Sequence, residues 1–143
     1  MNVIIDTNLW ISFLIGKKLS AMRFLFSHPG IRIYVCRELL EEFACVSSRL
    51  KIRKYITDND VEDSYRLMDA HCCYVTIDKR AISPVRDKKD LYLLSLAERA
   101  SADFILTGDK DLLSLQFHNQ TKIITYKEFS AIIGNNYELR LIE

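Results

Sequence analysis

The chain begins with a run of β-branched residues, Val3 to Ile5, that stops at the acid Asp6. A continuous apolar run of this kind, without alternation, is typical of a strand covered on both faces within a parallel sheet. Four further strands are expected in residues 31–36, 73–77, 103–106 and 122–125. Because parallel strands need long crossover connections, the segments between them are expected to be helical.

Helical patterns occupy those segments. We expect helices at residues 9–15, 19–28, 37–50, 58–72, 88–101 and 127–133, with a short turn after Asp109. Thr57 or Asp58 is suited to cap the helix that begins at residue 58. Strands that alternate with helices predict an α/β fold, doubly wound around a central parallel sheet of about five strands.

The length and composition fit one soluble domain spanning residues 1–143. These 143 residues are 49% hydrophobic and 27% charged, as in an ordinary globular protein. Residues 134–143 are polar and Asn-rich, so we expect a short extension or a last strand there. No segment approaches the roughly 20 apolar residues of a membrane span, and Asp6 interrupts any leader-like run. We therefore expect a cytoplasmic protein without a signal peptide.

The four cysteines are also consistent with the expected cytoplasmic location. Cys36, Cys45, Cys72 and Cys73 show no Cys-x-x-Cys spacing, and two adjacent cysteines do not suit a tetrahedral zinc site. We interpret them as buried thiols of a reducing environment.

Acidic residues follow two of the expected strands. Asp6 comes directly after an apolar run, and Asp109 follows the run 104–106 after Thr107 and Gly108. Ligands of open parallel sheets bind beyond the carboxyl ends of the strands. Asn8 is placed to cap the next helix or to hydrogen-bond Asp6, and Thr107 supplies a hydroxyl near the carboxylates. The alternative is that Asp6, Asp109 and Asp111 only cap helices.

Helical geometry selects Glu42 from the three glutamates of residues 37–50. The apolar stripe of this segment consists of Leu39, Phe43, Val46 and Leu50. Each residue advances about 100° around a helix, so Glu42 falls about 60° to 70° from the centre of the stripe, whereas Glu41 points nearly opposite. We expect Glu42 to face inward and Glu41 to be solvated. Taken alone, Glu42 is also compatible with a surface position.

Two acids compete for a place at the start of the helix 88–101. Asp87 and Asp90 have the spacing of an acidic capping box, which is a sufficient explanation for Asp87. Asp90 shares a helical face with Leu94 and Ala97 and is therefore expected on the buried side. Asp90 is the preferred third acid of the site, and Asp87 remains the alternative.

Carboxylates gathered in one crevice repel each other and lose solvation unless a divalent cation neutralises them. Hard oxygen ligands suit Mg²⁺ or Mn²⁺, and the sequence has no histidine cluster of the kind that zinc hydrolases use. One or two such ions lower the pKa of a bound water and neutralise a phosphate under attack. A metal site that acts on phosphate esters is therefore the first hypothesis.

Taken together, these residues resemble the PIN-domain ribonucleases, from residues 3–8 (VIIDTN) to residues 123–129 (IITYKEF). Within that superfamily the chain is most similar to the bacterial and archaeal PIN proteins grouped as toxins of type II toxin–antitoxin systems, related to VapC. The resemblance implies a Rossmann-like fold and a cleft that cuts RNA with Mg²⁺ or Mn²⁺. It implies metal-binding and catalytic roles for Asp6, Glu42, Asp90 and Asp109, an additional acid at Asp111, and supporting roles for Asn8 and Thr107.

The same resemblance implies a protein antitoxin as partner and a homodimer. An RNA substrate also needs cations at the rim of the site. The net charge is +1, but bases cluster in residues 49–54 and around Arg80, Arg86, Lys88 and Lys89. Lys51 and Arg53 are our candidates for phosphate contacts, and simple solvated side chains are the equally weighted alternative.

Three other functions were compared with a nuclease. A receiver domain needs paired acids after its first strand, and a haloacid-dehalogenase phosphatase needs an aspartate where Asn8 stands. Both are disfavoured. A PIN-like module that binds RNA or protein without cutting remains the serious alternative.

Overall fold

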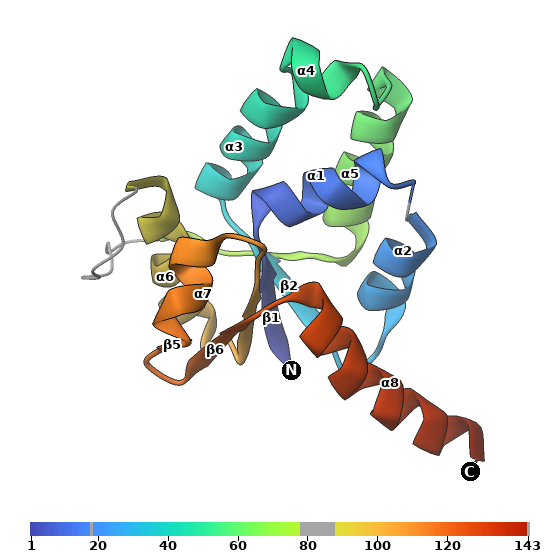
Figure 1. Cartoon of the computed structure of the whole chain (residues 1–143), viewed down its shortest axis with the longest axis vertical. Coiled ribbons are helices and arrows are strands. Elements are labelled where there is room, and N and C mark those ends of the chain that lie inside the picture. The colour runs from blue at the N-terminus through green and yellow to red at the C-terminus, as the bar shows by residue number, and fades with distance from the viewer. Residues whose placement is uncertain (18, 78–87, 143) are drawn as a thin grey trace.

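The computed structural model describes residues 1–17, 19–77 and 88–142, with the side chains of all of these except 19–21, 88–89 and 135–142. The strands are β1 (Asn2–Ile5), β2 (Arg32–Val35), β3 (Cys73–Tyr74), β4 (Phe104–Leu106), β5 (Phe117–His118) and β6 (Thr121–Ile124). The helices are α1 (Thr7–Ile15), α2 (Leu19–Ser27), α3 (Arg37–Ser47), α4 (Leu50–Arg53), α5 (Asp58–His71), α6 (Lys88–Ala100), α7 (Lys110–Leu115) and α8 (Tyr126–Ile142). The expected α/β class is confirmed (Figure 1).

In the described residues the strands form a six-stranded sheet in the order β3-β2-β1-β4-β6-β5. Neighbouring strands are parallel except β5 and β6, which form an antiparallel hairpin. The expected five strands lacked β5, which is only two residues long and too short to give a pattern. The chain fills one side of β1 with β2 and β3 before it crosses to β4 on the other side. The topological switch point therefore lies between β1 and β4, where ligands of such sheets bind.

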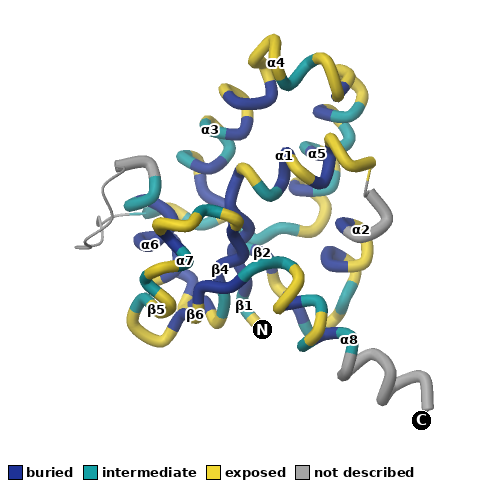
Figure 2. The backbone as a smooth tube through the Cα atoms, viewed as in Figure 1, coloured by how far each residue is buried: buried dark blue, intermediate teal, exposed yellow. Residues whose placement is uncertain are grey.

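Apolar cores cover both faces of this sheet, and Figure 2 shows the central strands as buried. Alternate residues of β1 face opposite ways, so Val3 and Ile5 join the core under α1 and α2, while Ile4 joins the core under α6 and α7. Trp10 of α1 is fully buried, and its indole N–H donates to the carbonyl of Ile5 at 3.1 Å. This bond ties α1 to β1 and so holds the turn that contains Asp6.

The helix expected at residues 37–50 is divided into α3 and α4. Backbone at Arg49 is extended, with φ −63° and ψ 136°, and α4 starts at the next residue. The expected stripe is buried at Leu39, Phe43 and Val46, but Leu50 is 86% exposed, so its assignment to the stripe was wrong. A hydrogen bond connects the two helices, because the guanidinium of Arg53 in α4 donates to the carbonyl of Ser47 at the end of α3 at 2.8 Å.

The structure also tests the expected cap at residue 57, the expected end of the chain and the expected absence of a membrane span. Thr57 caps α5, because its hydroxyl accepts the N–H of Asp60 at 3.2 Å and the Asp60 carboxylate accepts the N–H of Thr57 at 2.8 Å. The backbone of α8 is helical as far as Ile142, so a last strand after residue 134 was wrong. Among the described residues, no helix has both the length and the apolar character needed to cross a membrane.

The cysteines do not share one environment. Cys36 is buried, Cys72 and Cys73 are half-buried, and Cys45 is exposed. The expectation of buried thiols therefore fails most clearly at Cys45, which lies on the solvent side of α3.

Candidate functional site

The parallel pairing of β1 with β4 brings two predicted site residues together. Ile5 is in register with Leu106, so the residues that follow them, Asp6 and Thr107, emerge side by side at the carboxyl edge of the sheet. The N–H of Asp6 donates to the carbonyl of Leu106 at 2.9 Å, which extends the ladder by one bond. The hydroxyl of Thr107 donates to Oδ2 of Asp6 at 2.7 Å.

Asp6 is a buried carboxylate, with 3% of the residue exposed. It is the N-cap residue of α1 without a complete side-chain cap hydrogen bond, and the backbone N–H of Asn8 in the first turn acts on the carboxylate and lowers its pKa. Burial raises the pKa of Asp6, the Thr107 hydrogen bond opposes the rise, and the charges of Glu42 and Asp109 add to it. The three carboxylates are thus close enough to interact electrostatically.

Glu42 is half-buried on α3 and points toward Asp6, whereas Glu41 is exposed and pairs with Arg37 at 3.7 Å. Its Oε2 accepts a short hydrogen bond from the hydroxyl of Tyr92 and a longer one, 3.4 Å, from Thr7. The two hydroxyls lie 3.3 Å apart, so they form one network around this oxygen. Glu42 is therefore held in place by groups from α1 and α6.

Tyr92 was not predicted from sequence as part of the site. It is 5% exposed, and burial together with its hydrogen bond to Glu42 raises its pKa well above the ordinary range, so the hydroxyl keeps its proton. The available signal was a tyrosine inside the apolar run of α6, because a buried tyrosine hydroxyl usually finds a partner. Sequence alone does not say that the partner is Glu42.

Asp109 caps α7 and also belongs to the cluster around Asp6. Its Oδ1 accepts the N–H groups of Asp111 at 2.7 Å and Leu112 at 3.2 Å, so the expected capping of α7 is real. Its own N–H donates to the hydroxyl of Thr107 at 3.0 Å. Both capping bonds fall on one oxygen, while the charge of the same carboxylate acts on Asp6. Asp111 itself is exposed.

The remaining predicted site residues are less closely tied to this cluster. Asp90 is half-buried in the first turn of α6, on the face of the buried Leu94 and two residues before Tyr92. Asn8 is exposed, and its carbonyl accepts the hydroxyl of Ser12 at 2.9 Å. Asp87 lies outside the described residues, as do Arg80 and Arg86.

The two predicted RNA contacts differ in environment. Lys51 is exposed on α4, but Arg53 is half-buried, bonded to the carbonyl of Ser47 and paired with Asp58. Arg53 therefore has a structural function that its sequence position did not indicate.

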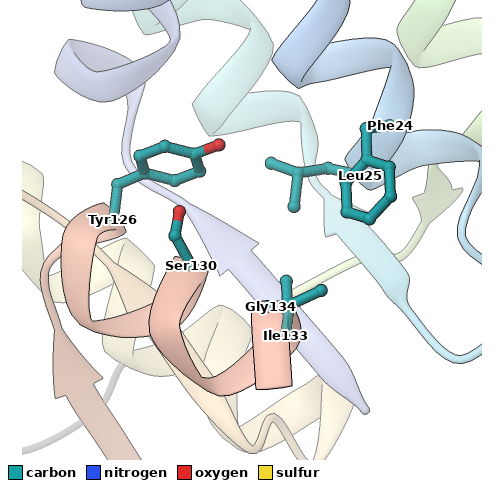
Figure 3. A pocket seen from close by; sticks show the side chains of 6 residues that line it. All are labelled: Phe24, Leu25, Tyr126, Ser130, Ile133 and Gly134. Carbon is teal, nitrogen blue, oxygen red and sulfur yellow. The ribbon is translucent and has the colours of Figure 1, made fainter. Parts of the chain in front are cut away.

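No three histidine, cysteine, aspartate or glutamate side chains among the described residues are arranged to hold a metal ion together. In this arrangement Glu42 accepts hydrogen bonds from two hydroxyls, and Asp109 caps α7. Figure 3 shows a pocket of about 110 Å³ between α2 and α8 that is distinct from this acidic cluster. Its lining is Phe24, Leu25, Tyr126, Ser130, Ile133 and Gly134, without a charged group that would suit a cation or phosphate.

Comparison with known proteins identifies the family. A family model described as PIN domain matches residues 2–111, a range that includes Asp6, Glu42, Asp90, Asp109 and Asp111. The chain belongs to the PIN domain family. Members of this family are usually nucleases and typically use divalent metals.

Two individual proteins are similar to this PIN domain. The uncharacterized protein MJ1680 of Methanocaldococcus jannaschii is 30% identical in an alignment that covers 90% of this chain and 89% of that protein. A solved structure, a domain of a functionally unknown protein from Methanocaldococcus jannaschii, is 14% identical with a TM-score of 0.49. That likeness covers 80% of this chain and 82% of the other.

Proposed function

We propose that this PIN domain is a metal-dependent endoribonuclease that hydrolyses RNA phosphodiester bonds at the carboxyl edge of β1 and β4. The observation that carries the proposal is the buried carboxylate of Asp6, which interacts with the charges of Glu42 and Asp109 at the switch point of the sheet. Such clustering of negative charge is unfavourable without a cation. Asp90 is proposed as the fourth acid, with Asp87 as its alternative.

The donor set fits Mg²⁺ or Mn²⁺, because carboxylate oxygens are the ligands that these hard cations prefer. Asp6, Glu42, Asp90 and Asp109 would hold the metal, with Asp111 as an additional acid. The metal would supply the positive charge that polarises the phosphodiester and the attacking water. Glu42 and Asp109 would offer the oxygens that do not already accept hydrogen bonds from Tyr92, Thr7 or the N–H groups of α7.

Polar neighbours would orient these ligands. Thr107 holds Asp6 from β4, and Tyr92 and Thr7 hold Glu42. Hydrogen bonds to metal-ligating side chains fix their orientation and contribute to metal affinity. Asn8, on the exposed side of the turn, is proposed as a further supporting residue near the substrate.

The biological proposal is a cytoplasmic toxin of a toxin–antitoxin system, supported by the resemblance of the motif set to the VapC group. A small antitoxin encoded in a neighbouring reading frame is the proposed partner, and a homodimer is the proposed assembly. Co-expression tests this part: the neighbouring frame should relieve growth inhibition caused by the wild-type chain. Inhibition that persists with the partner present would contradict it.

The direct test of the nuclease is RNA cleavage by purified protein with Mg²⁺, with Mn²⁺ and with EDTA. Wild type should cut only with a metal, and Asp6→Asn and Asp109→Asn should abolish cutting, because each removes a charged ligand with little change of shape. Asp69→Asn changes an exposed carboxylate of α5 and is the matched control, which should cut normally. Full cleavage by Asp6→Asn protein would refute the metal mechanism.

A non-catalytic PIN module that binds RNA or protein is the second candidate. It is favoured by the hydrogen bonds that occupy Glu42 and Asp109 in an arrangement without a formed metal site in the described residues. The two functions differ in the same experiment: a binding module retains RNA in a gel shift but leaves it intact with every metal.

A further inference from the structure

The short helix α4 exposes two large apolar side chains within one and a half turns. Leu50 is 86% exposed and Tyr55, two residues beyond the end of the helix, is 58% exposed. In Figure 1, α4 lies at the end of the arm formed by α3 and α5, away from the sheet. A single apolar side chain on a surface needs no explanation, but two close together beside basic residues indicate an interaction surface.

The exposed side chains belong to α4 and to the turn that follows it. Lys51 lies about 100° around the helix axis from Leu50, and Lys54 and Tyr55 form a turn closed by the hydrogen bond from the N–H of Tyr55 to the carbonyl of Ile52 at 2.9 Å. Ile52 and Arg53 are half-buried against the body of the protein. The α4 outer face is the surface formed by Leu50, Lys51, Lys54 and Tyr55.

The cations of this face are uncompensated. Lys51 and Lys54 are exposed and form no ion pair with any described residue, and the same holds for the neighbouring Arg49. The nearest acid along the chain, Asp58, is paired with Arg53. The α4 outer face therefore offers positive charge and an accessible aromatic ring together.

We propose that the α4 outer face binds single-stranded RNA, with a base stacked on Tyr55, the sugar or base edge against Leu50, and phosphates at Lys51 and Lys54. An aromatic ring between cations is how proteins hold single strands without sequence preference. Paired bases do not expose their faces to a side chain, so a duplex would lose the contact with Tyr55. A second copy of the chain is disfavoured, because a two-fold contact through this face would bring the lysines of both copies together.

This inference rests on the proposed function, whose substrate it narrows to a single strand. Glu42 lies five residues before the end of α3 at Ser47, roughly 8 Å along the helix axis. Because α4 follows α3 directly in the chain, a strand bound at the α4 outer face can extend along α3 toward the acidic cluster. The face would grip the substrate at a distance from the reacting phosphate.

The test measures binding without cleavage. A fluorescent single-stranded RNA of about twelve nucleotides is titrated with the full chain in EDTA across a salt series. Tyr55→Ala should weaken binding about 5- to 100-fold, whereas Tyr55→Phe, which keeps the ring, should bind as wild type does. Lys51→Ala with Lys54→Ala should weaken binding and reduce the slope of log affinity against log salt by about 1.4, about 0.7 for each lost phosphate contact.

Matched controls separate this surface from general effects. Tyr74 on β3 is 57% exposed, nearly as much as Tyr55, so Tyr74→Ala removes an equally accessible ring elsewhere. Lys122→Ala with Lys127→Ala removes the same charge from exposed positions on β6 and α8. Both control proteins should bind RNA with wild-type affinity and salt slope. All variants alter exposed side chains, and their circular dichroism and thermal unfolding should match wild type.

Equal RNA affinities for wild type, Tyr55→Ala and the double lysine variant would overturn the inference and would leave the face to a protein partner. A duplex of the same sequence that binds as tightly and depends equally on Tyr55 would overturn the choice of a single strand. Neither result touches the nuclease, which is measured separately by cleavage. Conversely, if RNA binding depends on Tyr55 but the protein cuts no RNA, the α4 outer face is supported as an RNA-binding surface and the nuclease proposal is refuted.

Discussion

The hydroxyl of Thr107 donates to the carboxylate of Asp6 across 2.7 Å, although the two residues are 101 positions apart in sequence. The same hydroxyl accepts the N–H of Asp109 at 3.0 Å. One side chain at the end of β4 thus orients the buried acid of β1 and the first residue of the turn into α7. The position of this acidic cluster depends on the pairing of β1 with β4.

Replacement of Thr107 by valine should therefore destabilise the protein. Valine keeps the shape but leaves the buried carboxylate of Asp6 without its donor, at a cost of about 1–3 kcal/mol in the free energy of unfolding. Urea unfolding at pH 7 measures the difference, and Thr107→Ser, which keeps a hydroxyl, should lose much less. Equal stability of the valine variant and wild type would mean that the bond contributes little to the fold.

The pH dependence of stability should show the cost of burying Asp6. Burial raises its pKa in the folded protein above 3.8, so the folded state binds the proton more tightly than the unfolded state. The contribution of Asp6 to the free energy of unfolding is therefore most favourable below pH 3.8. It is lost as the pH rises from 3.8 through the pKa of Asp6 in the folded protein. In EDTA, Asp6→Asn should unfold at a higher temperature than wild type at pH 7.

Thermal unfolding of both proteins over a pH series checks this, because the advantage of Asp6→Asn should shrink toward pH 3.8, where wild type also gains a proton. Addition of Mn²⁺ should stabilise wild type more than the variant, since ligand binding to the folded state raises stability. An Asp6→Asn protein that is less stable than wild type at every pH would show that the carboxylate stabilises the metal-free fold.

Removal of the Tyr92 hydroxyl should weaken metal binding. Tyr92→Phe keeps the buried ring but leaves Glu42 with only the longer hydrogen bond from Thr7, and loss of an orienting bond typically costs about 10- to 100-fold in metal affinity. Calorimetric titration with Mn²⁺ measures it. Tyr65→Phe is the control, because the half-buried Tyr65 forms no hydroxyl hydrogen bond within the described residues. Equal Mn²⁺ affinity of Tyr92→Phe and wild type would exclude an orienting role.

Alanine substitutions of Arg53 and Lys51 should have different effects on stability and on RNA binding. Arg53→Ala removes the bond to the Ser47 carbonyl and the pair with Asp58, and should lower the free energy of unfolding by about 1–2 kcal/mol. Lys51→Ala should leave stability unchanged and weaken RNA binding. Urea unfolding and RNA titration on both proteins check this. A stable Arg53→Ala protein with reduced RNA affinity would instead support the sequence-based prediction that Arg53 contacts substrate.

Local patterns were sufficient for most of the elements and for the acids that follow them. The apolar runs before Asp6 and Asp109 and the helical position of Glu42 depend on neighbours within a few residues, and strand and helix periodicities report such neighbours directly. The break between α3 and α4 was not visible in this way. Arg49 and Leu50 continue an acceptable helical pattern, yet the backbone at Arg49 is extended and Arg53 bonds to the carbonyl of Ser47 across the break.

The sequence by itself determined the α/β class, the order of most elements and which acids end strands, because these follow from residue type and local spacing. The tertiary structure alone decided which side chains meet: Thr107 with Asp6, and Tyr92 with Glu42. It also decided that Leu50 and Tyr55 are exposed and that Arg53 is hydrogen-bonded to the carbonyl of Ser47. Strand pairing and helix packing join residues far apart in the chain, and no local periodicity records which of the possible partners the folded chain brings together.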